Sequence, residues 1–289
     1  MLYVWTSDRA KNSGEGKLAR MFVEYLIDKN NYKIKFNTNQ QKNYNRYISP
    51  FIGILYCWKN YLKKRKVAYI NYLPFWNCFI FILLPPKTIL GPITGGALFN
   101  KNNLFNYLIR KYLFNLLYKI SELIINIRFS NLIFSTDLLK KYLSKKTIKK
   151  SNFNFVFTNF VIKKAVKKKI DFLIYYRKHN NKEKFFPYNL IKKLINLDFQ
   201  INIIGDKLDI PSVRNFGRVS VKKVSELQSI SRYTIASGEN PYSFFILESL
   251  SNNMKIIINK NSKYKIKFYK LNFIEIDFND AKYLKKIKV

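Results

Sequence analysis

Short apolar runs alternate with longer segments of helical spacing along the first half of the chain. Apolar runs bounded by turn-forming residues predict strands at Leu2–Trp5, Tyr32–Phe36, Val67–Tyr72, Thr88–Leu90, Phe153–Phe160 and, ahead of a helix cap, Asn131–Asp137. Apolar residues three and four positions apart predict helices at Leu18–Ile27, Tyr47–Lys63, Trp76–Leu84, Leu104–Ile127 and Leu138–Leu143. This alternation predicts a parallel sheet with helices on both faces.

The second half of the chain repeats the same alternation. Strands are expected at Asp171–Tyr176, Phe199–Asp206, Asn215–Val219, Tyr233–Ala236, Met254–Asn259 and Phe273–Phe278, and helices at Tyr188–Leu197, Val221–Ser231 and Phe244–Leu250. The lysine-rich segment Lys163–Lys169 separates the two halves and is typical of a solvated linker. The pattern therefore predicts two α/β domains, at residues 1–165 and 166–289.

The composition narrows the partners and excludes some kinds of site. The 289 residues are 48% hydrophobic, enough for a core, and carry a formal net charge of +36, which attracts polyanions such as nucleic acid or anionic lipid. The two cysteines, Cys57 and Cys78, have neither disulfide nor metal spacing, and His179 is the single histidine, so no metal site is expected.

No signal peptide is expected, because the first residues run straight into a strand, and a cytoplasmic location is expected. The most apolar run, Tyr72–Pro86, is shorter than the roughly 20 residues that span a bilayer, so it indicates a buried or an interfacial segment. Leu104–Ile127 mixes apolar and basic residues, which suits either core packing or an anionic membrane surface.

Two glycine-containing loops follow expected strands in the first domain. Gly14 and Gly16 follow the first strand, and Gly91-Pro-Ile-Thr-Gly95-Gly96 follows the strand at Thr88–Leu90. Glycines at such places serve as plain turns or let backbone approach a ligand closely. The first loop lacks the third glycine of a dinucleotide fingerprint.

The most informative stretch lies in the second domain, where turn formers separate the strand Tyr233–Ala236 from the helix at Phe244. Ser243 is a suitable N-cap for that helix, and Glu239 and Glu248 flank its start. The N-terminus of a helix suits a phosphate, and a carboxylate one turn further along can bind ribose hydroxyls. Earlier in the same domain, Arg177 and Lys182 follow the first strand with four residues between them, and both could neutralise phosphate.

These motifs, in this order, resemble the retaining glycosyltransferases of the GT-B fold, the family-4-like group. In that family a Glu-Pro-Phe-Gly-Leu run enters a helix and a second Glu follows after seven residues. Here Asn240-Pro-Tyr-Ser-Phe-Phe-Ile-Leu-Glu248 has this spacing, with Asn240 in place of the first Glu and Glu239 one residue earlier. The resemblance covers most of the chain and is clear from Asp171 to Asn259.

The resemblance implies a fold of two Rossmann-like doubly wound domains facing across a cleft, the second one shortened. It implies an acceptor-side first domain with cleft loops at Gly14, Gly16, Gly95 and Gly96. The donor-binding residues would be Arg177, Lys182, Ser243, Phe244 and Glu248, and the catalytic positions Glu239 or Asn240.

The implied activity is metal-independent transfer of a sugar, with retention of configuration, from a nucleotide sugar to a glycan or lipid-linked acceptor. No cofactor is implied, and surface polysaccharide synthesis at the inner face of a membrane is the expected setting. Two alternatives stay open: an inactive protein of the same fold, which the change to Asn240 favours, and a basic protein that binds polyanions such as nucleic acid.

Overall fold

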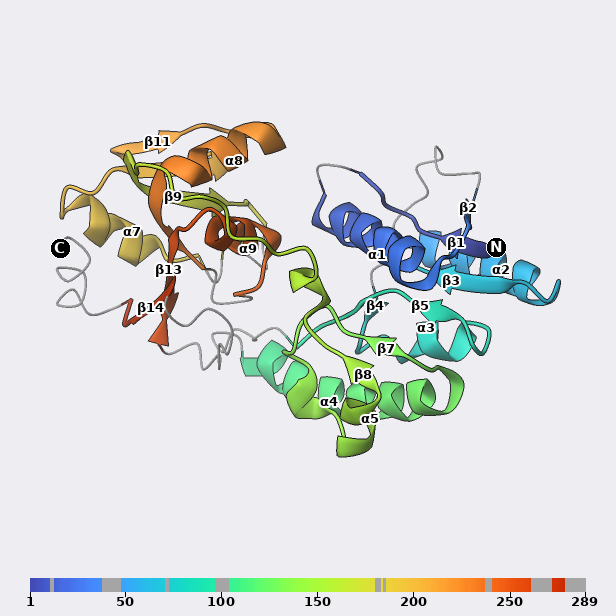
Figure 1. Cartoon of the computed structure of the whole chain (residues 1–289). Coiled ribbons are helices and arrows are strands. Elements are labelled where there is room, and N and C mark those ends of the chain that lie inside the picture. The colour runs from blue at the N-terminus through green and yellow to red at the C-terminus, as the bar shows by residue number, and fades with distance from the viewer. Residues whose placement is uncertain are drawn as a thin grey trace. The chain divides into compact units, whose positions relative to one another are not determined.

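The computed structural model describes residues 1–10, 13–37, 48–70, 73–96, 104–179, 183, 186–236, 241–260 and 272–278. The described residues divide into two compact units. Unit 1 comprises Met1–Gly96 and Lys101–Asn159, and unit 2 comprises the described residues from Phe160 onward (Figure 1).

Unit 1 is built on a four-stranded parallel sheet of order β2-β1-β3-β5. Its strands are β1 (Leu2–Trp5), β2 (Ile34–Phe36), β3 (Lys66–Tyr69) and β5 (Ile89–Leu90). Two short parallel pairs extend the unit: β4 (Leu73–Pro74) with β6 (Ile93–Thr94), and β7 (Leu132–Ile133) with β8 (Ser151–Asn152). A further parallel bridge joins Ile93 to Phe134.

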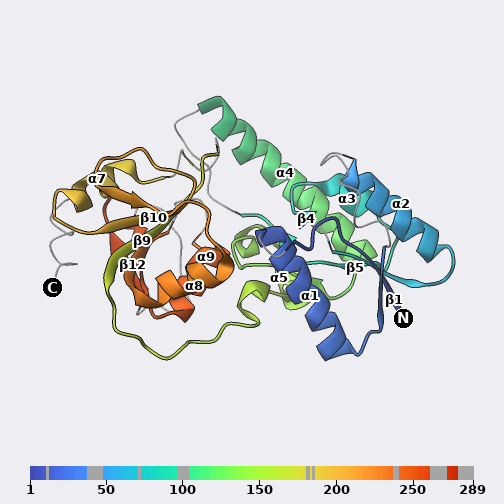
Figure 2. The same cartoon turned by 90° about the horizontal axis from the view of Figure 1, so that it is seen from above.

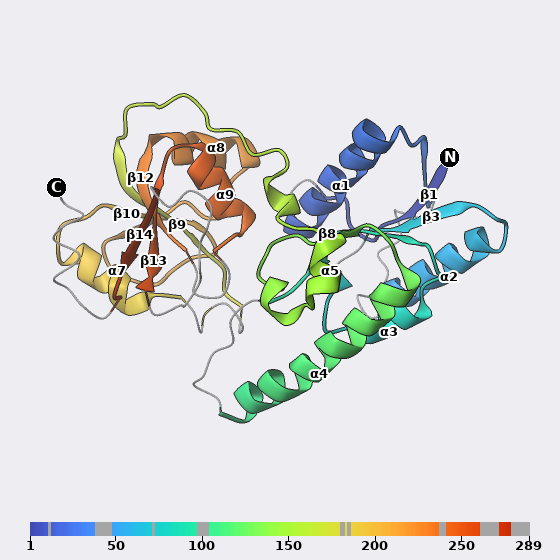
Figure 3. The same ribbon diagram turned by 60° about the horizontal axis from the view of Figure 1, so that its bottom comes forward.

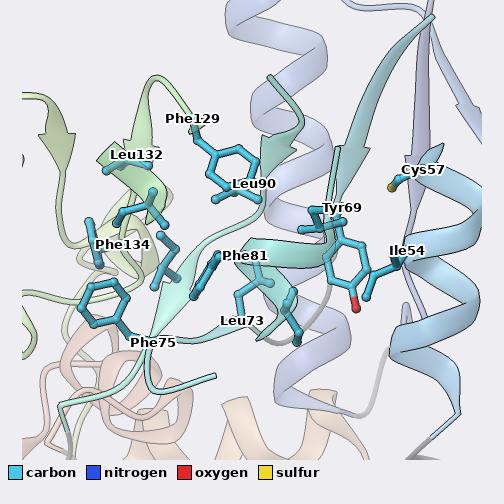
Figure 4. Close-up of a cluster of buried hydrophobic side chains, with 14 of the residues drawn as sticks. Ile54, Cys57, Tyr69, Leu73, Phe75, Phe81, Leu90, Phe129, Leu132 and Phe134 are labelled. Carbon is cyan, nitrogen blue, oxygen red and sulfur yellow. The ribbon is translucent and has the colours of Figure 1, made fainter. Parts of the chain in front are cut away.

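The helices of unit 1 pack on this framework through an aromatic core. They are α1 (Gly14–Asn30), α2 (Ser49–Tyr61), α3 (Cys78–Leu83), α4 (Leu104–Arg128) and α5 (Lys145–Lys149). Figure 4 shows Tyr69, Phe75, Phe81 and Phe134 converging in this core, and all four are fully buried. Burial raises the pKa of the Cys57 thiol to about 12, so Cys57 acts as a small core residue.

Unit 2 contains a six-stranded parallel sheet of order β11-β10-β9-β12-β13-β14. Its strands are β9 (Ile170–Tyr176), β10 (Ile201–Gly205), β11 (Val213–Asn215), β12 (Ser231–Ile235), β13 (Lys255–Asn259) and β14 (Phe273–Ile276). Its helices are α7 (Tyr188–Ile195), α8 (Val221–Ile230) and α9 (Phe244–Ser251). Counted from β9, the strand order is 3-2-1-4-5-6, the order of a Rossmann fold.

Several local expectations for unit 1 are wrong. Gly14 and Gly16 lie in the first turn of α1, which Ser13 caps by accepting the Gly16 N–H at 2.8 Å, and not in a loop. The expected helix at Leu138–Leu143 is a single 3-10 turn at Lys140–Tyr142, and the helical turn comes later as α5. The strands β4 and β6 were not expected.

The expected strand at Phe153–Phe160 is also wrong. Only Ser151–Asn152 pair as β8, and Phe155–Phe157 form a 3-10 turn. Asn154 has a left-handed φ of 62° and turns the chain, so the Phe155 N–H donates to the Phe134 carbonyl at 3.1 Å. Phe155 then packs edge-on against Phe22 of α1, with ring centroids 5.4 Å apart.

The basic segment Lys163–Lys169 is solvated, as expected, since six of its seven residues are exposed and Lys168 is half-buried. It belongs to unit 2 and is attached to it by hydrogen bonds. The Lys163 N–H donates to the Ser251 carbonyl at 2.8 Å, and the Lys169 N–H donates to the Ile230 carbonyl at 2.7 Å. The Lys168 ammonium donates to the carbonyls of Ser229 and Asn252, at 2.9 and 2.8 Å, and burial lowers its pKa. The segment is therefore bound along the C-terminal ends of α8 and α9.

Candidate functional site

The strand order of unit 2 identifies one place where a ligand would bind. In an open parallel sheet, ligands bind beyond the carboxyl ends of the strands, where the order reverses. Here the reversal lies between β9 and β12, which pair in parallel with Tyr233 opposite Phe172. The chain leaves β9 at Arg177 and leaves β12 at Ala236. The segment after β9 and the start of α9 therefore belong to one edge of the sheet.

Arg177 is exposed and directly follows the last residue of β9. The backbone beside it is held by Asp206, at the end of β10. Asp206 Oδ2 accepts the Lys178 N–H at 2.9 Å, and Arg218 donates to Oδ1 through Nε at 3.1 Å and Nη2 at 2.8 Å. The carboxylate thus joins the segment that carries Arg177 to the end of the neighbouring strand.

Gly205 makes this close approach possible. Its φ is +105°, and a Cβ on it would lie 2.2 Å from the Tyr176 carbonyl oxygen. Its N–H donates to the Gly217 carbonyl at 3.0 Å, and the Asp206 N–H donates to the Tyr176 carbonyl at 3.0 Å. The carboxyl ends of β9 and β10 therefore approach each other closely at Gly205, and a side chain at this position would push them apart.

The N-terminus of α9 lies after β12, as expected. Ser243 has an extended backbone, and its hydroxyl accepts the Ile246 N–H at 3.4 Å, so it is the N-cap. The first N–H groups of a helix have no acceptor within the helix, and together they carry partial positive charge. Ser243 and Phe244 thus place the positively polarised N-terminus of α9 at the edge that Arg177 also borders.

A buried polar network holds α9 against α8. The Gln228 side chain of α8 donates to the Phe245 carbonyl and to the Ser249 hydroxyl, both at 3.1 Å. Its oxygen accepts from the Asn252 amide at 3.3 Å. Because Gln228 and Ser249 are buried, these bonds form away from water and fix the orientation of α9.

Glu248 lies one turn into α9 and is half-buried. Phe244 and Glu248 are four residues apart and therefore share a face of the helix. On α9, Phe245 packs against Tyr175 of β9, with ring centroids 5.7 Å apart. Strand β9 and helix α9, which both border the point where the strand order reverses, are thus in direct contact.

Three expected site residues, Lys182, Glu239 and Asn240, lie outside the described residues. Arg177, Ser243, Phe244 and Glu248 all lie on β9, on α9 or directly beside them. The pairing of Asp206 with Arg218 and the contacts of Gln228 were not foreseen, because each joins residues 12 or more positions apart. Gly205-Asp206 at the end of an apolar run was the one sequence signal for this corner.

The glycines expected to line a cleft have structural reasons for their positions. Gly16 would bring a Cβ within 2.4 Å of the Ala10 carbonyl oxygen. Gly95 and Gly96 have φ of +140° and +79°, and a Cβ on Gly96 would lie 2.6 Å from the Leu138 carbonyl carbon. Their expected role in ligand binding stays a prediction, as does the division into acceptor-side and donor domains at residue 165.

Among the described residues, no group of three or more His, Cys, Asp or Glu side chains could hold a metal ion. Arg177 and the terminus of α9 are positive groups at this edge, and the Arg218 guanidinium beside them pairs with Asp206. The arrangement can therefore bind an anionic group, and Glu248 lies one helical turn further along α9.

Arg218 and the Lys178 N–H hold the pKa of Asp206 below its usual range. A carboxyl whose pKa is lower in the folded state than in the unfolded state stabilises the fold only while it is ionised. The stabilisation from Asp206 is therefore expected to be complete above the ordinary Asp pKa of about 3.9 and to be lost as the pH falls through the lower pKa of the folded state. Carbon-13 NMR of the Asp206 carboxyl would give the titration midpoint. Arg218→Ala should raise the midpoint, whereas Arg214→Ala on β11 should not; a wild-type midpoint at or above the ordinary value would contradict the pairing.

No protein-family model matches the chain, and no curated protein matches its sequence. Solved structures do resemble it. A glycosyltransferase from Rickettsia africae ESF-5 is 13% identical, with 99% of this chain and 86% of that chain covered and a TM-score of 0.51.

Two further structures resemble it over nearly all of its length. Anabaena HepE, in complex with UDP and glucose, is 10% identical over 99% of this chain and 88% of that chain, with a TM-score of 0.52. Methanocaldococcus jannaschii UDP-GlcNAc 2-epimerase, in complex with UDP-GlcNAc and UDP, is 11% identical over 99% and 91%, with a TM-score of 0.53. At such identities the likeness concerns the fold, and it agrees with the strand order of unit 2. The chain has the GT-B fold, built from two Rossmann-like α/β units.

Proposed function

We propose that the protein is a glycosyltransferase that takes a sugar from a nucleotide-sugar donor. The observation that carries the proposal is the edge of unit 2 where Arg177 and the N-terminus of α9 both border the reversal of strand order. The similar structures support it, because HepE and the epimerase were solved with UDP or a UDP-sugar bound.

In this proposal the diphosphate of the donor lies between the segment after β9 and the start of α9. Arg177 and Lys182 contribute positive charge, and the N–H groups at Ser243 and Phe244 donate to phosphate oxygens. Glu248 accepts hydrogen bonds from the ribose hydroxyls. Glu239 or Asn240 faces the sugar.

The reaction breaks the bond between the anomeric carbon and the diphosphate and forms a bond from that carbon to an acceptor oxygen, which loses its proton. Negative charge grows on the departing diphosphate, and donors already aimed at it stabilise that charge without reorganisation. The positive groups of this edge supply that role without a metal ion. Retention of configuration is proposed by resemblance to the family-4-like enzymes.

For the acceptor we propose a glycan or lipid-linked saccharide in surface polysaccharide synthesis, with the protein at the cytoplasmic face of a membrane. The fold alone does not choose the chemistry, since one of the similar structures is an epimerase. A protein that has lost its donor site, or one that binds nucleic acid through its charge, is the competing function.

The test is a screen of UDP-, GDP-, ADP- and CMP-sugars by thermal shift and calorimetry. One donor class is expected to bind and, at a hundred times its Kd, to stabilise the protein by about 2.7 kcal/mol, which raises Tm by roughly 5–10 °C. Incubation with the bound sugar nucleotide then separates transfer or hydrolysis, which release the nucleotide, from epimerisation, which does not. If the folded protein binds none of them, the donor site is refuted, and RNA binding under a salt titration tests the charge-based alternative.

A further inference from the structure

Helix α4 has two apolar faces instead of one. Tyr118, Ser121 and Ile125 face inward and are buried. The opposite face carries exposed apolar side chains at steps of three and four residues, so they form a single stripe along the helix: Tyr112, Leu116, Ile120, Leu123 and Ile127. Leu116 is 56%, Leu123 63% and Ile127 75% exposed. A helix of a globular protein ordinarily presents polar residues on its outer face.

Helices α2 and α3 continue this surface. Each packs inward onto the same core cluster as α4, through Ile54 and Cys57 of α2 and Ile80 and Phe81 of α3. Helix α3 contacts both of the others, and Figures 2 and 3 show the three in a row along one side of unit 1. Their outward residues therefore form one surface, the α2–α3–α4 face, composed of Phe51, Leu55, Leu62, Phe79, Ile82, Leu83, Tyr112, Leu113, Leu116, Ile120, Leu123 and Ile127.

The charge on this face has one sign. The sequence contains no Asp or Glu between Asp28 and Glu122, a stretch that includes α2, α3 and most of α4. Glu122 is engaged within the unit, where its Oε1 accepts the Ser144 N–H at 2.7 Å. Lys59 and Lys119 are exposed on α2 and α4, and Lys63, Lys64 and Arg65 follow the end of α2. Cations thus accompany the apolar residues without neighbouring carboxylates.

A contiguous exposed apolar face of this kind indicates a binding surface. A second copy of the chain is a poor occupant, because a symmetric contact would set these cations against each other with no carboxylate to pair them. No described helix is long and apolar enough to cross a membrane. An interfacial surface, by contrast, needs apolar side chains together with nearby lysines for lipid phosphates.

We propose that the α2–α3–α4 face docks on the surface of an anionic lipid bilayer, with its Phe and Leu side chains among the headgroups and Lys59 and Lys119 at the phosphates. The inference deepens the proposed function by naming the surface that holds the enzyme at its lipid-linked acceptor. It rests on unit 1, whereas the donor site rests on unit 2, so the two fail separately.

Vesicle flotation of the full chain tests the apolar part. The protein is expected to float with phosphatidylglycerol-containing vesicles and much less with pure phosphatidylcholine. The triple variant Phe79→Ser, Leu116→Ser, Leu123→Ser should lose roughly a hundredfold in vesicle affinity, because each residue withdraws an apolar side chain from the interface. Its fold should survive, since all three are exposed. The matched control Val161→Ser, Ile162→Ser, Val221→Ser changes equally exposed apolar residues of unit 2 and should bind like wild type.

Charge reversal tests the electrostatic part. Lys59→Glu with Lys119→Glu should weaken binding to the anionic vesicles on the order of tenfold or more, and Lys192→Glu with Lys222→Glu in unit 2 should weaken it much less. Nucleotide-sugar binding should be unchanged in all these variants, which separates this proposal from the donor site.

Three outcomes would overturn the proposal. Wild-type protein that stays unbound with anionic vesicles refutes the bilayer as occupant. A triple variant that floats as well as wild type assigns the binding to charge elsewhere. If the wild-type protein is a dimer in solution, the triple variant is a monomer, and neither binds vesicles, the face belongs to a second copy of the chain.

Discussion

Gly205→Ala is expected to destabilise unit 2 by about 3 kcal/mol or more. At a φ of +105° an alanine is strained, and its methyl carbon would lie 2.2 Å from the Tyr176 carbonyl oxygen and 3.0 Å from the Tyr175 ring. That oxygen belongs to the backbone of β9, so it cannot rotate away as a side chain would. Either β9 and β10 separate at their carboxyl ends, or unit 2 unfolds at a lower denaturant concentration.

The measurement is hydrogen exchange at the amides of β10 together with urea unfolding of the whole chain. Gly217→Ala is the matched control, because Gly217 also has a positive φ, +69°, but no atom lies within 4 Å of its Cβ position. It should lose only about 1 kcal/mol, the conformational strain alone. If the two variants lose the same stability, the close approach of β9 and β10 contributes nothing.

Strand β9, which borders the site, could be predicted because it is largely apolar on both faces. The expected strand Asp171–Tyr176 differs from β9 by one residue, and all of its residues except Asp171 and Tyr175 are buried. The start of α9 was predictable from Ser243, whose hydroxyl does cap the helix. Parallel strands and caps are specified locally, so the sequence pattern identifies them directly.

The errors arise where tertiary contacts outweigh local pattern. Aromatic and β-branched residues at Phe153–Phe157 favour a strand by propensity, but Phe155 packs on Phe22, far away in the sequence, and the chain turns at Asn154. Glycine is a poor helix former, so the first turn of α1 was taken for a loop. Ser13, which caps Gly16, was the overlooked signal.

The same reasoning explains which parts of the site were missed. Arg177 and Glu248 could be placed from the sequence because Arg177 directly follows a recognisable strand and Glu248 lies in a recognisable helix, and their roles in donor binding stay predictions. Arg218 was missed, since its partner Asp206 lies across the corner formed by β10 and β11. Gln228 was missed because a buried amide in a helix resembles a surface residue in sequence. Pairs of this kind depend on the packed fold, which the linear pattern does not specify.

Glu248→Ala is expected to weaken binding of the nucleotide sugar by about a hundredfold, and Glu248→Gln by about tenfold. Hydrogen bonds to a charged acceptor contribute about 1.5–3 kcal/mol, which corresponds to roughly 10- to 150-fold in Kd. The amide of Glu248→Gln keeps one acceptor oxygen but loses the charge, so this variant should lower the affinity less than Glu248→Ala does. Calorimetry with the donor from the screen gives both values. Glu226→Gln is the control, because Glu226 lies on α8 and pairs with Lys223 at 3.2 Å.

The role assigned to Glu248 is specific enough to be separated from that of Arg177. If Glu248 binds the ribose, Glu248→Ala must lower the affinity for the nucleotide sugar, the nucleoside diphosphate and the nucleoside by the same factor. If Arg177 binds phosphate, Arg177→Ala must lower the affinity for the nucleotide sugar and the nucleoside diphosphate and leave the affinity for the nucleoside unchanged. A Glu248→Ala variant that binds all three like wild type, with an unchanged Tm, would remove the carboxylate from the donor site. The helix terminus and Arg177 would then form a site for phosphate alone.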